Sequence, residues 1–398
     1  MSAAGGLPSG AGARRLLMVE QGGRGGVSDY TAELVAALAA EGWAVTLATA
    51  ADHRYRPVQG VTVVPVFHYT RGDTRFGRAL RERGLGKLAN GLRFLAALPR
   101  LTALARSADV VHSQGWEVPQ LGPLALACLR ATGRPVVQTE HGTFDRAQDR
   151  LFGTASHARR LSGRLAARTI VHTQADLDRV APPLRGRARV IPHGEYGGLA
   201  RSGGTAERER ARAALDLAPD VPVTLMFGQL RGDKGLDDLA QAVARVPGLQ
   251  LLVGGQDIGG LSAAREHLDA LGARVSVREG FLDMRDTAQL FAATDTVALP
   301  YRQASQSGVL LLAYGFARPV VVYPSGGLVE AVIDGETGWI CERPDIESLT
   351  AALADSVRAG TEECLRRGRA GERLADERFA WPAIARRTAA LYEEALAG

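Results

Sequence analysis

The chain has 398 residues, of which 46% are hydrophobic and 23% charged, with a formal net charge of +5 at pH 7. This length is about twice that of a usual single domain and the composition is globular, so two domains with separate cores are expected. The modest charge gives no reason to expect a nucleic-acid partner, and no apolar run reaches the roughly 18 residues of a membrane-spanning helix. The three cysteines lie far apart without metal-ligand spacing, which favours a reducing, cytoplasmic compartment.

Residues 1–13 are small, lack the apolar stretch of a signal peptide and are expected to form a disordered tail. After them, apolar runs typical of β-strands alternate with helical patterns such as Asp29–Glu41. In the first half the expected strands are Arg15–Glu20, Ala44–Thr49, Val61–Val66, Asp109–Ser113, Pro135–Glu140, Thr169–His172 and Arg189–Ile191. A second series comprises Pro222–Gly228, Leu249–Gly254, Val275–Glu279, Thr296–Pro300, Pro319–Tyr323 and Gly338–Cys341. This alternation predicts βαβ units and parallel sheets.

A Gly- and Ser-rich stretch separates the two series, and we expect a linker at 195–217. The predicted fold is therefore α/β, with an N-terminal Rossmann-like domain at 14–194 and a C-terminal one at 218–376. A last helix lies within 377–398 and packs on either domain. Because doubly wound domains bind ligands at the carboxyl ends of their strands, the predicted ligand site is a cleft between the domains.

A glycine-rich loop, QGGRGGVSD, follows the first expected strand at Gln21–Asp29 and opens a helix. Glycines such as Gly25 and Gly26 let backbone N–H groups approach an anion at a helix N-terminus. A tight turn without a ligand explains the same loop, because the third glycine of a dinucleotide fingerprint is absent.

A second loop, FGQLRGDKGL at Phe227–Leu236, joins a strand to a helix. Arg231 and Lys234 flank the helix start, so two cations converge with a helix N-terminus. That arrangement can neutralise a diphosphate and stabilise it as a leaving group. Solvated loop charges are the alternative.

A third segment, YRQASQSGV at Tyr301–Val309, precedes an apolar helix. Ser305, Gln306 and Ser307 supply polar groups, and Gly308 and Val309 supply backbone amides at that helix N-terminus. Capping explains one of the serines, but the polar cluster as a whole indicates a ligand.

Between Arg75 and Arg106 eight basic residues face one acid, Glu82, and alternate with leucines. The pattern predicts a basic amphipathic helix over 75–106. It is typical of a solvated helix face, and also of a helix that contacts an anionic bilayer or an anionic acceptor.

In their order and spacing these elements resemble the retaining group 1, or family 4, glycosyltransferases, which have the GT-B fold of two Rossmann-like domains facing across a cleft. The matching elements are Gly22–Ser28, Asp109–His112, Glu140–Gly142, Ile191–Gly194, Gly228 with Lys234 and Gly235, Asp295–Pro300, Gly308–Val321, Gly326 and Gly327 with Glu330, Asp334–Gly338 and Phe379–Tyr392. They span nearly the whole chain.

The resemblance implies transfer of a sugar from a nucleotide diphosphate sugar to a small-molecule, glycan or lipid-linked hydroxyl acceptor, with retention of configuration. It implies that no metal or other cofactor is required, and that the last helix returns to the N-terminal domain. Arg231 and Lys234 would hold the diphosphate, with Gly25 and Gly26 approaching from the other domain. By the same resemblance His141 would contact the donor sugar, Glu330 the ribose, and the backbone of Gly280, Phe281 and Leu282 the base. The protein would be cytoplasmic, at most peripheral to the inner membrane face, and a monomer or homodimer.

The sequence departs from the family at the third loop. Two glutamates usual there would stand at Ala304 and Leu312, and no acid occurs between Tyr301 and Val329. Ser305, Gln306 and Ser307 are expected to replace them, as in a recognisable subset of the family. Two alternatives stay open: a non-hydrolysing nucleotide-sugar epimerase, and a non-catalytic homologue that binds a nucleotide without turnover.

Overall fold

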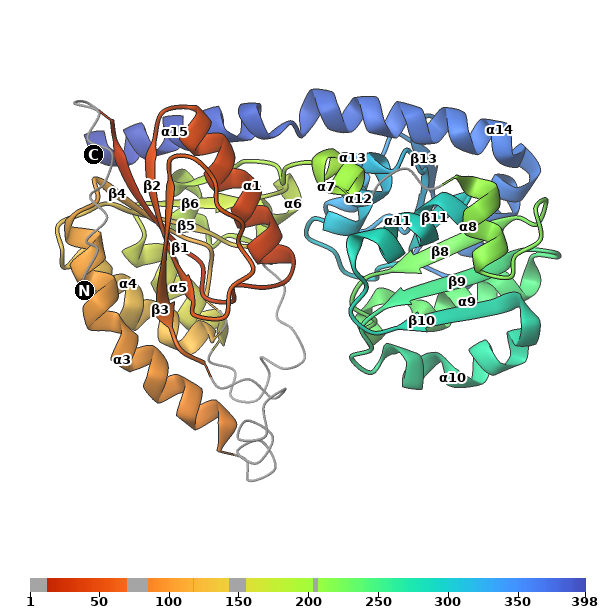
Figure 1. Cartoon of the computed structure of the whole chain (residues 1–398), viewed down its shortest axis with the longest axis horizontal. Coiled ribbons are helices and arrows are strands. Elements are labelled where there is room, and N and C mark those ends of the chain that lie inside the picture. Colours follow the sequence, from red (N-terminus) through yellow and green to blue (C-terminus); the bar gives the residue numbers. More distant parts are fainter. Residues whose placement is uncertain (1–12, 70–84, 117, 143–154, 203–206) are drawn as a thin grey trace. The chain divides into compact units, whose positions relative to one another are not determined.

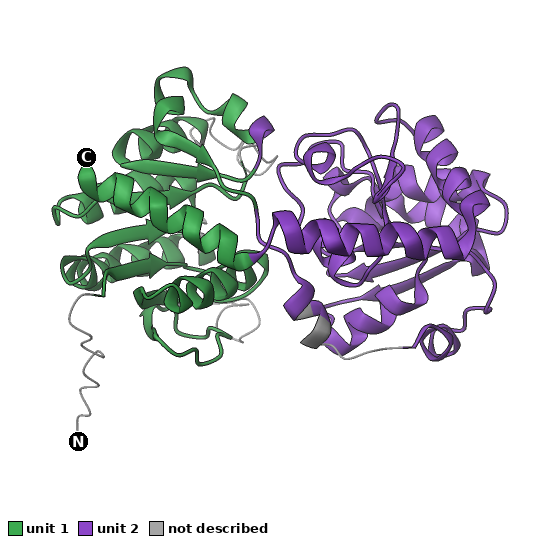
Figure 2. Cartoon of the chain, turned by 90° about the horizontal axis from the view of Figure 1, so that it is seen from above, with its two compact units in different colours: residues 1–172, 176–192, 381–398 green, residues 173–175, 193–380 purple. Residues whose placement is uncertain are grey.

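The computed structural model describes residues 13–69, 85–116, 118–142, 155–202 and 207–398. The chain divides into two compact units (Figure 2). Unit 1 comprises Met1–His172, Asp176–Pro192 and Trp381–Gly398, and unit 2 comprises Thr173–Ala175 and His193–Ala380. The predicted α/β class with two Rossmann-like domains is confirmed, since each unit contains a parallel sheet of its own.

Unit 1 is built on a seven-stranded parallel sheet of order β3-β2-β1-β4-β5-β6-β7. Its strands are β1 (Arg15–Val19), β2 (Ala44–Ala50), β3 (Val61–Phe67), β4 (Val110–Ser113), β5 (Val136–Thr139), β6 (Arg168–Val171) and β7 (Ala188–Val190). The helices of this part of the chain are α1 (Gly26–Ala40), α3 (Gly86–Arg106), α4 (Gly122–Arg130), α5 (Ala155–Leu165) and α6 (Gln174–Arg179), with 3₁₀ turns at Pro119–Leu121 and Pro182–Arg187.

Both faces of this sheet are buried, which explains why its strands are continuous apolar runs. Successive side chains of a strand point to opposite faces. Leu16 and Met18 of β1 therefore pack in a core with α1, whereas Leu17 and Val19 pack in a second core with α3 and α4.

Unit 2 has a six-stranded parallel sheet of order β10-β9-β8-β11-β12-β13 and one continuous core (Figure 1). The strands are β8 (Val223–Phe227), β9 (Gln250–Gly255), β10 (Val275–Glu279), β11 (Thr296–Leu299), β12 (Val320–Val322) and β13 (Gly338–Ile340). The helices are α7 (Gly197–Ser202), α8 (Arg208–Ala214), α9 (Leu236–Arg245), α10 (Gly260–Leu271), α11 (Met284–Ala293), α12 (Gly308–Gly315), α13 (Leu328–Ala331) and α14 (Ile346–Arg378), with 3₁₀ turns at Gly232–Lys234 and Gly272–Arg274. Each of the thirteen strands in the described residues begins and ends within one residue of its predicted bounds.

The segment expected as a linker, 195–217, belongs to unit 2, and its residues 203–206 lie outside the described part. It contains α7 and α8, and its buried residues Tyr196, Ala211 and Leu215 belong to the core of that unit. Sequence composition suggested a linker because the apolar residues that dock these short helices are sparse among glycines, serines and charges.

The last helix, α15 (Trp381–Ala397), belongs to unit 1, where it packs beside α1. Its buried Ile384 and Leu391 join the α1 side of the core, and the Tyr392 hydroxyl lies 2.6 Å from Nδ1 of His112 on β4. The helix before it, α14, belongs to unit 2 and is broken at Gly360, where φ is 78°.

The predicted basic helix 75–106 is described only from residue 85 onward, and residues 75–84 lie outside the described part. Its apolar residues divide over two faces of α3. Phe94 and Leu98 are buried against the sheet, whereas Leu88 and Leu92 are exposed. Within the described residues no helix is long and apolar enough to span a bilayer.

Candidate functional site

The candidate residues of unit 2 lie where its parallel strands end. The sheet order places β8 near the centre, with β9 and β10 on one side and β11 to β13 on the other (Figure 1). Strands β9 and β10 are thus added on one side of β8 and strands β11 to β13 on the other, so the strand order reverses between β8 and β11. Open α/β sheets bind ligands at such a switch point. The loops after these two strands, 228–235 and 300–307, carry the predicted phosphate ligands.

Two glycines fix the loop after β8. Gly228 has a φ of 109° and Gly235 a φ of 75°, in the region that side chains rarely adopt. A Cβ on Gly235 would lie 2.2 Å from the carbonyl oxygen of Pro300, so only glycine lets this loop rest on the end of β11. The close approach places Lys234 Nζ 3.6 Å from the ring centre of Tyr301. The ammonium is thus oriented at the switch point by a cation–π contact.

Arg231, the second predicted cation, is bound to a carboxylate of its own loop. Its Nε and Nη2 atoms donate to Asp233 Oδ1 and Oδ2, both at 2.8 Å. The guanidinium lowers the pKa of the Asp233 carboxyl, which is therefore ionised at neutral pH. A diphosphate would have to compete with Asp233 for Arg231.

The N-terminus of α12 forms the other side of the switch point. Ser307 is its N-cap, and the Ser307 Oγ accepts a bond from the Leu310 amide at 3.3 Å. A Cβ on Gly308 would lie 3.1 Å from the Tyr196 ring, so this ring packs against the first turn. The amides of Gly308 and Val309 have no intrahelical acceptor, and the helix dipole favours an anion beside them.

Gln306 carries a buried acceptor that lacks a protein partner. Its Oε1 atom is buried, and no residue that the structure describes donates a hydrogen bond to it. The backbone beside it is closely packed, since a Cβ on Gly326 would lie 1.8 Å from the Ala304 carbonyl oxygen. Leaving an amide oxygen buried without a donor costs about 1–3 kcal/mol. A ligand hydroxyl that donates to Gln306 would recover this cost.

The neighbours of Gln306 provide no carboxylate. Ser305 is buried beside it, and Ala304 and Leu312, where the family glutamates would stand, are buried apolar residues. Gln306 Oε1 is therefore the acceptor that this loop offers in their place.

Glu330 has both carboxylate oxygens engaged. Oε2 accepts from the Gln174 amide and Oε1 from the Ala175 amide, each at 2.9 Å. Glu330 thereby caps the start of α6. A carboxylate has about four acceptor positions, so a ribose contact would use those that remain.

The segment predicted to meet the base directly follows β10. Gly280 has a φ of 124°, and its amide donates to the Gly255 carbonyl oxygen at 3.0 Å. Leu282 packs against the core, whereas Phe281 is 75% exposed. This turn therefore presents an aromatic ring, in addition to backbone groups, at the ligand-binding edge of the sheet.

In unit 1 a buried carboxylate organises the glycine loop after β1. Glu20 Oε1 accepts from the Gly22 amide at 2.7 Å and Oε2 from the Gly23 amide at 2.8 Å. These two amides therefore serve the loop itself. Gly25, with a φ of 86°, and Gly26 begin α1, and a Cβ on either would meet no atom within 4 Å. The open side of the loop thus lies at the two glycines predicted to approach the diphosphate.

His141 lies at the end of β5 in a chain of hydrogen bonds. Buried His172 donates from Nδ1 to the Ile191 carbonyl oxygen at 3.0 Å, because that oxygen can only accept. Burial lowers the pKa of His172, so its imidazole is neutral and carries a single proton, on Nδ1. His172 Nε2 is therefore an acceptor, and it lies 3.2 Å from His141 Nδ1. His141 Nε2 lies 2.8 Å from Gln114 Oε1, and the Tyr30 ring packs edge-on against the imidazole. His172 Nε2 and Gln114 Oε1 are both acceptors, so a proton on either ring nitrogen of His141 makes one of these two bonds, and the contacts fix the orientation of the ring.

Glu140, the neighbour of His141, accepts a hydrogen bond from Gln138. Burial raises the pKa of the Glu140 carboxyl to about 7. The group therefore titrates near neutral pH.

Sequence reasoning missed the partners that hold these groups: Tyr301 under Lys234, Glu20 in the glycine loop, and Gln114 and His172 around His141. A signal existed for some of them. Gln114 and His172 each directly follow a buried strand, where ligand-binding side chains collect in such sheets. The composition holds another signal, since Lys234 is one of only two lysines among 48 basic residues.

Comparison with known proteins agrees with this geometry. A family model described as Glycosyltransferase Family 4 matches residues 24–194, and one described as Glycosyl transferases group 1 matches residues 221–359. A D-inositol 3-phosphate glycosyltransferase of Xylanimonas cellulosilytica is 32% identical, over 94% of this chain and 93% of that protein. The chain belongs to the family 4, group 1 glycosyltransferases.

Solved structures confirm the GT-B fold for this glycosyltransferase. The sucrose-phosphate synthase of Thermosynechococcus elongatus matches with a TM-score of 0.75 at 22% identity, covering 96% of this chain and 99% of that one. Anabaena HepE, solved in complex with UDP and glucose, matches with a TM-score of 0.73 at 19% identity, covering 96% and 100%.

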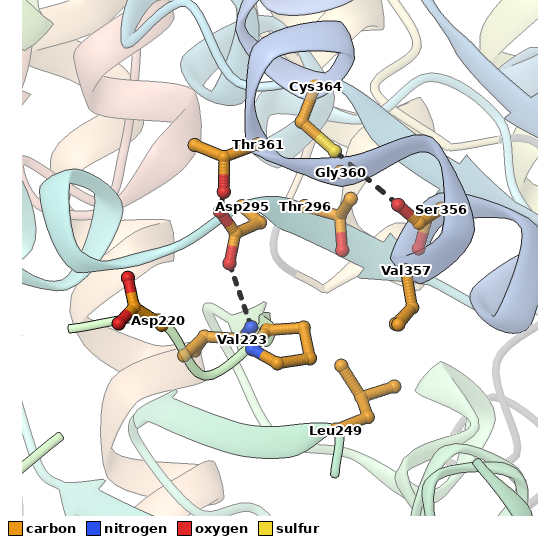
Figure 3. A pocket seen from close by; sticks show the side chains of 11 residues that line it. Asp220, Val223, Leu249, Asp295, Thr296, Ser356, Val357, Gly360, Thr361 and Cys364 are labelled. Carbon is orange, nitrogen blue, oxygen red and sulfur yellow. Dashed lines mark hydrogen bonds between the residues drawn. The ribbon is translucent and has the colours of Figure 1, made fainter. Parts of the chain in front are cut away.

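A cavity of about 260 Å³ lies at the opposite edge of the unit 2 sheet, where β8 and β11 begin, and its lining side chains are drawn in Figure 3. Its main charged group is satisfied, because Asp295 accepts bonds from Arg208, Arg212 and the Val223 amide. The cavity is therefore not a candidate for the transfer site. Across the described residues no cluster of three or more His, Cys, Asp and Glu side chains is placed to hold a metal ion.

Proposed function

We propose that this glycosyltransferase moves a sugar from a nucleotide diphosphate sugar to a hydroxyl acceptor with retention of the anomeric configuration. The observation that carries the proposal is the switch point of unit 2. There Lys234 lies on Tyr301, and the same loop leads from Tyr301 to the N-terminus of α12 and to Gln306, whose buried acceptor has no partner among the described residues. A cation, a helix N-terminus and a hydroxyl acceptor together match a sugar nucleotide.

The diphosphate is held by Lys234, by Arg231 after it exchanges Asp233 for phosphate oxygens, and by the first turn of α12. That turn contributes Ser307, Gly308 and Val309, and we also assign Gly25 and Gly26 to the diphosphate. These groups stabilise the charge that develops on the leaving diphosphate, which is the role that a metal ion has in other transferases. We therefore propose that the reaction needs no metal.

The remaining donor groups have separate ligands. Gln306 and Ser305 bind hydroxyls of the donor sugar, and Glu330 binds a ribose hydroxyl. The turn Gly280–Leu282 binds the base, on which the exposed ring of Phe281 stacks. His141 contacts the donor sugar through Nε2, where a sugar hydroxyl takes the place of Gln114.

Retention fits the absence of a carboxylate in the third loop. No Asp or Glu occurs between Tyr301 and Val329, so that segment supplies neither a carboxylate nucleophile nor a carboxylate base. In the proposed reaction the acceptor attacks from the face that the diphosphate leaves, and a phosphate oxygen takes the acceptor proton. The protein contributes positioning and charge stabilisation.

The first acceptor to test is an inositol phosphate. Relatives over most of this chain are named D-inositol 3-phosphate glycosyltransferase, at 32% and 28% identity. The first donor to test is UDP-glucose, which is bound in a solved structure of HepE.

The experiment is an assay of nucleoside diphosphate release from a panel of UDP, GDP, dTDP and ADP sugars, with and without acceptor. Acceptor-dependent release that Lys234→Ala abolishes supports the proposal. Interconversion of the sugar without release would identify an epimerase. Nucleotide binding without either reaction, over a broad acceptor panel, would identify a non-catalytic homologue.

A further inference from the structure

Unit 1 exposes a line of leucines along α3. Leu85, Leu88, Leu92 and Leu95 are 46%, 63%, 60% and 39% exposed, and we call them the leucine stripe. Their spacing of three and four residues places them on one side of the helix. The side packed on the sheet is a separate set that includes Phe94, so the stripe is not part of the core of unit 1.

The helices beside α3 continue this apolar surface. Helices α3, α4 and α5 pack side by side on one face of the sheet, and α4 and the turn before it expose Leu124 and Val118. Leu161 of α5 is 46% exposed. Seven of the eleven large hydrophobic side chains exposed in the described residues lie on these helices or at their starts, so the apolar exposure is concentrated on one layer.

The same layer is strongly basic. Together α3, α4 and α5 contain no Asp or Glu and eight basic residues: Lys87, Arg93, Arg100, Arg106, Arg130, Arg159, Arg160 and Arg164. The layer on the other face of the sheet differs, since α1 and α15 contain the acids Asp29, Glu33, Glu393 and Glu394. The exposed leucines thus lie on the layer of helices that carries basic residues and no acidic ones.

We propose that this layer is a docking surface for an anionic lipid bilayer. Leucines on a helix that lies in the membrane plane enter the boundary of the acyl chains, while Lys and Arg beside them contact anionic headgroups. A second copy of the chain fits less well, because a two-fold contact would place this basic surface against itself. The leucine stripe, from Leu85 to Leu95, would contact the bilayer over about 15 Å.

The test is flotation of the full chain with vesicles of phosphatidylcholine, with or without about 30 mol % phosphatidylglycerol. The triple variant Leu88→Ser, Leu92→Ser, Leu95→Ser removes most of the stripe but no charge. The double variant Arg100→Glu, Arg160→Glu reverses two exposed charges of the layer. The control, Arg369→Glu with Arg387→Glu, makes the same charge change on α14 and α15. Thermal melts check that each variant is folded, as expected for exposed positions.

Wild type is expected to float with the anionic vesicles and to be released at about 0.5 M salt. Both layer variants should bind these vesicles at least about tenfold more weakly, while the control stays within about twofold of wild type. The proposal is overturned if wild type stays in solution with anionic vesicles, or if the leucine variant binds as wild type does. It is also overturned if wild type without vesicles is a dimer that the leucine variant dissociates, because a second copy then covers the surface.

Discussion

Replacing Gln306 with methionine should change protein stability and ligand affinity in opposite directions. Methionine has nearly the shape of glutamine but no amide. The unpartnered Gln306 Oε1 is buried, and such an acceptor costs the ligand-free protein about 1–3 kcal/mol. Gln306→Met should therefore raise the free energy of unfolding without ligand, by about 1 kcal/mol. Loss of the bond to a donor hydroxyl should weaken sugar-nucleotide binding by about 1–3 kcal/mol, which is about 5- to 150-fold in Kd.

Urea unfolding measures the first effect, and titration calorimetry with the sugar nucleotide and with the nucleoside diphosphate alone measures the second. The matched control is Gln241→Met, which removes an amide on α9 that already donates to Asp237 at 3.1 Å. It should not stabilise the protein and should leave donor affinity unchanged. The reasoning is refuted if Gln306→Met is less stable than wild type, or if it binds the sugar nucleotide equally well.

Three further substitutions test the loop after β8 and the group beside His141. Lys234→Met should lower kcat by about 100- to 1000-fold, because it removes a cation facing the leaving diphosphate. The control Arg245→Met removes an exposed charge and should leave kcat unchanged. An equal loss of kcat in both variants would contradict the role proposed for Lys234. Asp233→Asn frees Arg231 and should tighten donor binding about threefold at low salt. The effect should be smaller at high salt, because Asp233 is about half exposed. An unchanged affinity at low salt would show that Asp233 does not compete with the diphosphate for Arg231. The pKa of Glu140 in the folded protein, about 7, lies above its unfolded value of 4.5, so the protonated group stabilises the fold below pH 4.5 and this contribution disappears as pH rises through 7. The free energy of unfolding of wild type, measured with urea, should fall by about 2–3 kcal/mol between pH 4.5 and pH 8 relative to that of Glu140→Gln. Parallel pH profiles of the two unfolding free energies would disprove this.

Much of the fold was predictable because both sheets are parallel and buried on both faces. Their strands are therefore short apolar runs that stand out from the surrounding helices, as Val223–Phe227 does. The positions of the two loops proposed to bind phosphate were predictable for a related reason. A cation or a glycine directly after a buried strand lies at the carboxyl edge of the sheet, so Lys234, Gly235 and Ser307 could be placed from the sequence alone.

The contacts that hold the site could not be predicted, because they join residues distant in sequence. Tyr301 meets Lys234 only after β11 pairs beside β8, and His172 reaches His141 only across two neighbouring strands. The bond between Arg231 and Asp233 is local, but a charged pair in a loop is equally typical of a solvated turn. The two apolar faces of α3 were also hidden, because a leucine count does not tell which side of a helix meets the sheet.

The most direct test of the proposed function is the anomeric configuration of the product. The chain would be incubated with the α-linked donor from the panel that gives acceptor-dependent nucleotide release, and the purified product examined by proton NMR. We expect wild type to form an α-linked product and Lys234→Met to lose it. A β-linked product would contradict front-face transfer beside a third loop that lacks a carboxylate. An unchanged yield from Lys234→Met would contradict the role of the switch point of unit 2.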